Sequence, residues 1–184
     1  MNGLFKTAAL FLGLGAAALG TYLVTIQLTG NFAAVVPGEV YRSNQPTAAD
    51  IAAYAGRYGI RTIINLRGRE ENAAWYEDEV AAAKRLGIGL VDFPMVADQH
   101  LDAQGAARLV AILKDAPRPI LIHCRSGADR TGLVSVIYLA KVAKVDEATA
   151  ERQLSVRYGH IGIPVLSPTY AMDESWEALE MAGT

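Results

Sequence analysis

The sequence has little cysteine, few histidines and no cluster of basic residues. Its 184 residues include one cysteine, which excludes an intramolecular disulfide. The three histidines, His100, His123 and His160, lie far apart, and no Cys/His pair has zinc-site spacing, so we expect no metal. The net charge is −2 and no run of Lys or Arg occurs. These features give no reason to expect a nucleic-acid partner.

Charged residues are also missing from Thr7 to Leu28. This run of about 22 apolar or small residues is long enough to cross a bilayer as a helix. Lys6 precedes it and no positive charge directly follows it, which indicates that the N-terminus stays in the cytoplasm. We therefore predict a membrane-anchored protein whose catalytic part lies outside the cytoplasm, on the periplasmic side where a periplasm exists.

A cleaved signal peptide is the alternative for this run. Ala18-Leu19-Gly20 offers a small-x-small cleavage site. The apolar character continues to Ile26, which is longer than a signal peptide needs and favours an uncleaved anchor. A buried core helix is a third interpretation, but nothing downstream requires one. We predict an anchor or signal segment over residues 1–30 and one further domain over residues 31–184.

Helix and strand patterns alternate through the second segment. Two helical patterns each end at a glycine, Gly59 and Gly87, which accepts the left-handed backbone that follows many helices. An apolar strand pattern follows each glycine, so we predict helices over 51–58 and 71–86 and strands over 60–66 and 88–93. This alternation predicts an α/β fold with a central, mainly parallel sheet and helices on both faces.

Other stretches lead to more local expectations. Residues 29–38, with two glycines and a proline, indicate a linker. Thr47 is expected to cap a helix that has Asp50 in its first turn. Further helices are expected over 133–143, which is apolar almost all round, from Asp146 to about residue 158, and over 170–181.

One polar loop stands between two apolar segments. The strand pattern of 120–122 leads into His-Cys-Arg-Ser-Gly-Ala-Asp-Arg-Thr-Gly at 123–132, and the apolar helix pattern follows. A loop curled onto a helix N-terminus aims several backbone N–H groups at one point, which suits a phosphate. The same field favours the reactive thiolate of Cys124, and Arg130 carries a planar fork that matches two phosphoryl oxygens. The alternative, a packing cysteine beside a helix-capping arginine, fits this polar run poorly.

This stretch resembles the Cys-x5-Arg signature of the cysteine-based phosphatases, in the His-Cys-x5-Arg-Thr-Gly form of tyrosine-specific and dual-specificity enzymes. A second stretch, Tyr-Arg-Ser-x-Gln-Pro at 41–46, resembles the start of the catalytic domain in bacterial periplasmic dual-specificity-like phosphatases. The resemblance implies the cysteine-phosphatase fold, a phospho-cysteine intermediate that water hydrolyses, and no cofactor. It implies that Cys124 is the nucleophile, that Arg130 clamps the phosphate and that Thr131 eases departure of the sulfur. The implied phosphate-binding loop consists of Arg125, Ser126, Gly127, Ala128, Asp129 and Arg130.

In this family the general acid is an aspartate on a loop upstream of the cysteine. Asp92 lies inside a strand pattern, and Asp102 is better explained as a helix N-cap. Asp98 lies in the expected loop 94–101 and has no evident structural role, so we predict that it is the acid. Asp129 is the rival, because the loop aspartate has been proposed as the acid in phosphoinositide-type members. Many of those members carry a lysine where this chain has Ala128.

The expected function is hydrolysis of phosphomonoesters, above all phosphotyrosine on proteins, with phosphoserine and phosphothreonine as further substrates. A phosphoinositide or small-molecule phosphatase is the alternative enzyme, and a non-catalytic phosphate-binding module is the alternative of another class. Arg42 and Arg67 fit a site role or a solvated charge equally, whereas Arg69 and His160 fit a solvated loop charge and a packing residue better. The expected partners are a phosphorylated protein or other phosphomonoester, and the membrane.

Overall fold

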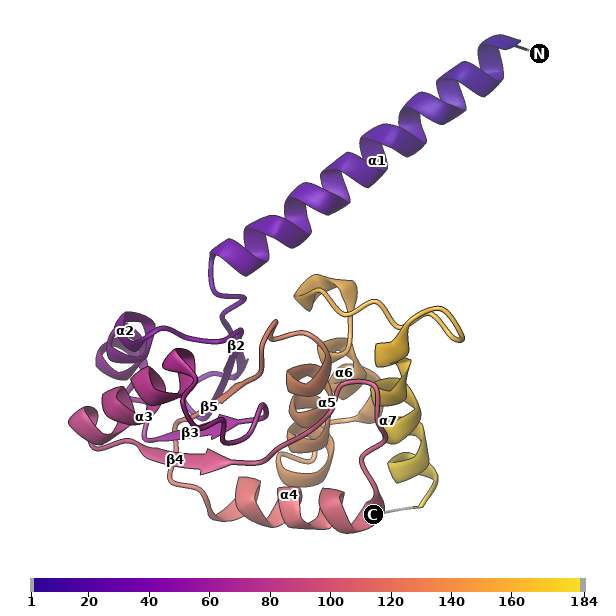
Figure 1. The fold of residues 1–184 in the computed structure, drawn as a ribbon. Helices are drawn as coiled ribbons and strands as arrows, with labels where there is room; N and C mark the ends of the chain where they lie inside the picture. The colour runs from indigo at the N-terminus through magenta and orange to yellow at the C-terminus, as the bar shows by residue number, and fades with distance from the viewer. Residues whose placement is uncertain (1, 183–184) are drawn as a thin grey trace.

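The structure is a computed structural model that describes residues 2–182. The chain begins with a long helix, α1 (Asn2–Leu28), that projects from the rest of the molecule (Figure 1). Residues Thr7–Leu28 of this helix have a mean hydropathy of 1.9, and the most apolar stretch contains no fully buried residue. Only Leu23, Ile26 and Gln27, near the end of the run, are half-buried. By length and composition, this helix is able to cross a membrane.

Five strands of the described chain form one sheet in the order β1-β2-β5-β3-β4. The pairs β2/β5, β5/β3 and β3/β4 are parallel, and only the pair β1/β2 is antiparallel. The prediction of an α/β fold with a mainly parallel sheet is therefore confirmed, with one antiparallel edge strand that makes the sheet mixed. The strands are β1 (Ala33–Val36), β2 (Val40–Ser43), β3 (Thr62–Asn65), β4 (Gly89–Asp92) and β5 (Ile120–His123).

Helices cover both faces of the sheet, as predicted (Figure 1). Alternate residues of β5 enter two separate cores, because successive side chains of a strand point to opposite faces. Leu121 packs with residues of α2 (Ala48–Tyr58) and α3 (Ala74–Leu86). Ile120 and Ile122 pack with the other core, which contains α4 (Ala103–Asp115), α5 (Asp129–Ile137) and α7 (Ala171–Met181). Both faces of the central strand β5 are thus covered by packed side chains.

The predicted helix ends on the α2/α3 side are confirmed. Thr47 and Asp50 form a reciprocal capping box at the start of α2. Gly59 and Gly87 follow α2 and α3 with φ of 69° and 67°, the left-handed backbone that glycine accepts most readily.

Two local predictions are wrong. The expected linker over 29–38 contains β1, which pairs with β2. The expected helix from Asp146 is broken into α6 (Glu147–Ala150), η2 (Glu151–Gln153) and η3 (Val156–Tyr158). The expected buried helix over 133–143 is confirmed, but it is α-helical only to Ile137, in α5, and π-helical in η1 (Tyr138–Val142). The C-terminal helix starts with a short 3-10 turn, η4 (Pro168–Tyr170), ahead of α7.

Candidate active site

The polar loop predicted from the sequence joins the central strand to a helix. β5 ends at His123, and α5 begins at Asp129 with Ala128 as its N-cap residue. Cys124 lies between them, with only 1% of its surface exposed. We call residues 124–130 the Cys124–Arg130 loop. Its position places backbone N–H groups and the positive end of the α5 dipole around the cysteine, which is an anion-binding arrangement.

Gly127 lets this loop approach the end of β2. Its φ is +69°, and a Cβ added there would lie 2.6 Å from the backbone carbon and oxygen of Ser43. Any side chain at this position would therefore displace either the loop or β2, besides adopting a backbone conformation that only glycine accepts easily.

Arg42, in β2, binds the backbone of the Cys124–Arg130 loop. Its side chain is fully buried, and its Nη2 donates to the backbone carbonyl of Gly127 at 2.7 Å. Its Nη1 donates to the backbone and side-chain oxygens of Gln153 at 2.9 and 2.8 Å, and the guanidinium stacks over the Tyr158 ring at 3.8 Å. Burial lowers the pKa of Arg42 to about 10, so the group stays charged at neutral pH. The interpretation of Arg42 as a solvated charge is wrong.

Gln45 supports the loop from the side. Its backbone N–H donates to the Arg125 carbonyl at 3.2 Å, and its side-chain amide donates to Glu79 at 3.2 Å. Its side-chain oxygen accepts a hydrogen bond of 2.9 Å from Arg67. The stretch 41–46 thus positions the Cys124–Arg130 loop through both Arg42 and Gln45.

The residue before the cysteine, His123, forms a buried pair with Glu79 that the sequence did not predict. Nε2 of His123 lies 2.6 Å from Oε1 of Glu79, and both side chains are fully buried. Glu79 occupies the inward face of α3 together with Tyr76 and Ala83. A single carboxylate on an otherwise apolar helical face is the sequence signal that could have identified it, because a buried charge needs a partner.

The end of α1 also contacts the loop. Gln27 in α1 and Asn31 just after it donate side-chain hydrogen bonds of 3.0 and 2.9 Å to the same acceptor, the backbone carbonyl of Ser126. Asn31 donates a second bond, of 2.8 Å, to the carbonyl of Tyr158. The sequence did not predict these contacts, because Asn31 fell in the expected linker.

Arg130 links the loop to two neighbouring segments. Its Nη1 donates to the backbone carbonyls of Leu66 and Met95, at 3.3 and 3.1 Å. Within the described chain, the buried Nε of Arg130 and the buried hydroxyl of Thr131 have no hydrogen-bond partner. A buried donor without a partner costs free energy, and a new hydrogen bond removes that cost. Both groups are therefore available to bind a phosphoryl group or the cysteine sulfur.

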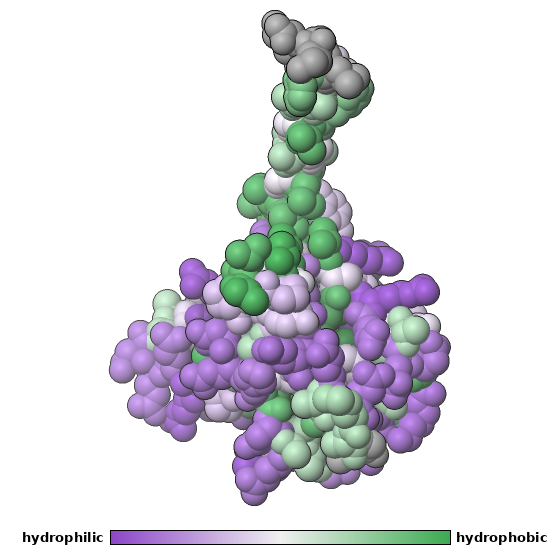
Figure 2. Space-filling model, turned by 90° about the vertical axis from the view of Figure 1, so that its right-hand side faces the viewer, coloured by the Kyte–Doolittle hydropathy of each residue, from purple (hydrophilic) through white to green (hydrophobic). Residues whose placement is uncertain are grey.

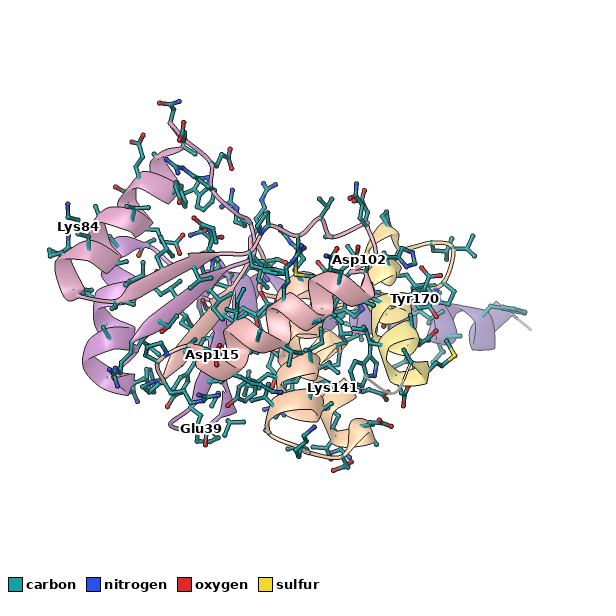
Figure 3. All side chains as sticks on the ribbon, turned by 90° about the horizontal axis from the view of Figure 1, so that it is seen from below. Glu39, Lys84, Asp102, Asp115, Lys141 and Tyr170 are labelled. Atoms are coloured by element: carbon teal, nitrogen blue, oxygen red, sulfur yellow. The ribbon has the colours of Figure 1, made fainter. Side chains whose placement is uncertain are left out.

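The candidate acids have different surroundings. Asp92 accepts hydrogen bonds from Asn65 at 2.9 Å and from Tyr76 at 2.6 Å, so its carboxylate has a structural role. Asp102 caps α4 by accepting from the Gly105 N–H, as predicted, and Figure 3 shows it at the start of that helix. Asp98 is exposed in a turn three residues after Met95, on the segment that Arg130 contacts.

Asp129 is engaged in a pair of contacts that centre on His160. Nδ1 of His160 lies 2.8 Å from Oδ1 of Asp129, and its Nε2 lies 2.9 Å from Oδ2 of Asp173. Burial disfavours the charged imidazole, but the two carboxylates outweigh burial and raise the pKa of His160 above its ordinary value. His160 therefore binds the first turn of α5 to α7, which the sequence did not predict.

Two further arginines differ in their environment. Arg67 stacks over the Trp75 ring at 3.4 Å, and burial lowers its pKa, as does the positive charge of nearby Arg130 and Arg125. These three arginines make the rim of the loop cationic. Arg69 is 69% exposed and pairs with Glu71 at 2.7 Å, consistent with the expected solvated charge. No group of three or more His, Cys, Asp or Glu side chains within residues 2–182 is placed to hold a metal ion.

The comparisons with known proteins agree with this architecture. Residues 29–169 match the family model described as the DSP-PTPase phosphatase domain of the Swiss Army Knife protein. The dual specificity protein phosphatase TpbA of Pseudomonas aeruginosa is 27% identical over 117 residues, which are 62% of this chain and 49% of that protein. The match thus spans about half the length of this curated relative.

Solved structures share the fold. The crystal structure of P. aeruginosa TpbA superposes with a TM-score of 0.65 at 22% identity, over 84% of this chain and 88% of that one. The core catalytic domain of the PP-IP phosphatase SIW14 from S. cerevisiae superposes with a TM-score of 0.59 at 22% identity, over 83% and 93% of the two chains. Because the family model covers most of the chain and includes the Cys124–Arg130 loop, this chain belongs to the DSP-PTPase phosphatase domain family, a family of cysteine-based dual-specificity phosphatases.

Proposed function

We propose that this protein hydrolyses phosphomonoesters through a phospho-cysteine intermediate, with phosphotyrosine on proteins as its main substrate. The observation that carries the proposal is the position of Cys124, buried at the end of β5 in a loop that leads onto the N-terminus of α5. A structure of a TpbA variant in complex with phosphotyrosine, at 22% identity and a TM-score of 0.56, supports the choice of substrate.

The residues of the site have distinct proposed roles. The thiolate of Cys124 attacks phosphorus, the ester P–O bond breaks, and Asp98 gives its proton to the leaving oxygen. The backbone of Arg125, Ser126, Gly127, Ala128 and Asp129 binds the phosphoryl oxygens, and Arg130 clamps two of them. Water then gives a proton to the ionised Asp98 and attacks phosphorus, the S–P bond breaks, and the hydroxyl of Thr131 stabilises the departing thiolate.

We further propose that α1 crosses a membrane and that residues 31–184 form the phosphatase domain on its extracytoplasmic side. The uncharged run Thr7–Leu28, with a mean hydropathy of 1.9 and no fully buried residue in its most apolar stretch, supports the span. The single Lys6 ahead of the run supports the orientation. A reporter fused to the C-terminus tests it, and a cytoplasmic reporter signal contradicts the orientation.

The activity is tested with the full chain in lipid vesicles, on p-nitrophenyl phosphate, on peptides with phosphotyrosine, phosphoserine or phosphothreonine, and on phosphoinositides. The expected result is turnover of the aryl phosphate and of phosphotyrosine peptides, with phosphate trapped on Cys124 after acid quenching. Faster turnover of phosphoinositides would favour that class of substrate. Phosphate binding without turnover of any substrate would instead make the protein a non-catalytic binding module.

A further inference from the structure

A second apolar surface lies beside the candidate acid, because Val165 and Leu166 line one cavity together with Asp98. Between η3 and η4 the chain forms a loop over residues 160–167, which we call the apolar loop. No Asp, Glu, Lys or Arg occurs from Tyr158 to Met172. The exposed fractions of its large side chains are 37% for Ile161, 45% for Ile163, 101% for Val165 and 76% for Leu166. Single exposed apolar residues are ordinary on protein surfaces, but four on one short loop indicate a contact surface.

The apolar loop is fixed at both ends. His160, at its start, is held between Asp129 and Asp173. Ser167, at its end, closes the loop by donating from its hydroxyl to the Ile161 carbonyl at 2.6 Å and from its backbone N–H to the Ile163 carbonyl at 2.9 Å. Val165, at the tip, has φ of +67°, a conformation that β-branched residues rarely adopt. The loop thus presents its apolar tip outward in a defined shape.

The base of this loop, which is the segment 157–159 that leads into it, contacts the last turns of α1. A Cβ added at Gly159 would lie 3.3 Å from Cδ1 of Ile26 and 3.8 Å from Cδ2 of Leu23. Two residues earlier, the carbonyl of Arg157 accepts a hydrogen bond of 2.6 Å from the Tyr22 hydroxyl. Figure 1 shows the loop on the side of the domain from which α1 emerges, and Figure 2 shows hydrophobic side chains gathered at the foot of that helix.

The length of α1 places this contact at the level of the bilayer. From Thr7 to Thr21, about 15 residues precede the first contact with the domain, which corresponds to about 22 Å of helix. The hydrocarbon core of a bilayer is about 30 Å thick. A bilayer that covers the whole apolar run must therefore reach the level of Leu23 and Ile26, and with them the base of the apolar loop.

We propose that the apolar loop inserts into the lipid interface around α1 and forms a second membrane contact of the phosphatase domain. This inference rests on the proposed membrane span. Lipid is favoured over a protein partner because the chain that leads into the loop packs, at Gly159, against the helix that lipid surrounds, and because the loop contains no Asp, Glu, Lys or Arg. Insertion would hold the domain in one orientation, and His160 would connect the inserted loop to Asp129 at the start of α5. The site would then favour phosphates close to the membrane surface.

Quenching by brominated lipids tests the insertion. The full chain is reconstituted into vesicles whose acyl chains carry bromine, as the wild type, as Leu166→Trp and as Met181→Trp. Met181 is a matched control, because it is 83% exposed and lies at the C-terminal end of α7. Trp75 and Trp176 give the same background in all three proteins. We expect added quenching in Leu166→Trp only. If the three vesicle-bound proteins are quenched equally, the inference is wrong. The apolar loop would then be a binding surface for an apolar protein partner.

A double variant, Ile161→Ser with Ile163→Ser, tests the consequence for substrates, because these two exposed side chains do not line the cavity that contains Asp98. We expect its turnover of soluble p-nitrophenyl phosphate to match wild type, and its turnover of a lipid-tethered phosphotyrosine peptide to fall about threefold or more. Met181→Ser should leave both rates unchanged. Equal losses on both substrates would mean a purely structural loop and overturn the inference. If an alkaline wash removes the protein from the vesicles, the proposed membrane span is wrong. If wild type stays on the vesicles but turns over no substrate, the proposed activity is wrong.

Discussion

The side-chain amide of Gln27, in the last turn of α1, donates a hydrogen bond of 3.0 Å to the backbone carbonyl of Ser126, in the middle of the Cys124–Arg130 loop. The same glutamine accepts, through its backbone carbonyl, a bond of 2.9 Å from the side chain of Asn44 just after β2. The proposed membrane helix is therefore not an independent tether, because its last turn supports the loop that carries the candidate nucleophile.

Replacement of Gln27 by alanine should weaken substrate binding. One net hydrogen bond contributes about 0.5–1.5 kcal/mol, so we expect KM for an aryl phosphate to rise about two- to tenfold. The change should be larger in the double variant with Asn31→Ala, because both side chains bind the Ser126 carbonyl. Thr29→Ala is the control, since this hydroxyl bonds to carbonyls of α1. Equal effects of Gln27→Ala and Thr29→Ala on KM would contradict the role of Gln27.

Cys124→Ser should abolish turnover and retain phosphate binding. A serine hydroxyl is far less ionised than a thiolate at neutral pH, whereas binding rests on the loop backbone and Arg130. Turnover of p-nitrophenyl phosphate and binding of a phosphotyrosine peptide by calorimetry measure the two effects separately. Substantial turnover by the variant would exclude Cys124 as the nucleophile.

The two candidate acids should respond differently to the leaving group. Asp98→Asn should slow phosphotyrosine and alkyl phosphates about a hundredfold or more, and an ester of a very acidic phenol much less, because poor leaving groups need the proton most. Asp129→Asn should lower kcat modestly and by the same factor for all leaving groups, since the Asp129 carboxylate is paired with His160. The measurement is log kcat against leaving-group pKa for wild type and both variants. A steeper slope in Asp129→Asn alone would transfer the acid role to the loop.

Gly127→Ala should damage the site far more than another glycine of similar backbone conformation. The added Cβ would clash with Ser43, and a displacement of about 1 Å near the reacting group can cost about a hundredfold in rate. Gly38→Ala is the matched control, because its φ is +80° and nothing lies within 4 Å of its added Cβ. The control should lose about 1 kcal/mol of stability and keep its activity. Thermal melting and aryl phosphate turnover distinguish the two, and an active Gly127→Ala enzyme would contradict the packing argument.

His160 should titrate above its ordinary pKa of about 6.5. Its contacts with Asp129 and Asp173 then contribute stability that is fully present below about pH 6.5 and is lost as pH rises through the raised pKa. NMR titration of the imidazole in the full chain measures this value. Asp173→Asn should lower it, and Glu177→Gln, an exposed change on the same helix, should not. A His160 pKa that Asp173→Asn leaves unchanged would contradict the pairing.

The features that depend only on neighbouring residues could be predicted from the sequence. The strand–loop–helix order around Cys124, the cap formed by Thr47, and the turns at Gly59 and Gly87 all follow from local side-chain chemistry and backbone freedom. The apolar run of α1 is equally local. The alternation of helix and strand patterns was sufficient for the α/β class, because each element has its own periodicity.

Which distant residues meet at the Cys124–Arg130 loop could not be predicted, because it depends on which strands pair in the folded chain. Arg42 and Gly127 are 85 positions apart, and they meet because β2 pairs with β5, a neighbour that periodicity does not specify. Arg42 also donates to the carbonyl of Gln153, the last residue of η2, where the helix expected after Asp146 is broken. The roles of His160 and Gln27 could not be predicted for the same physical reason. The hydrogen-bond partner of a polar side chain is known only once the fold brings the two groups within about 3 Å.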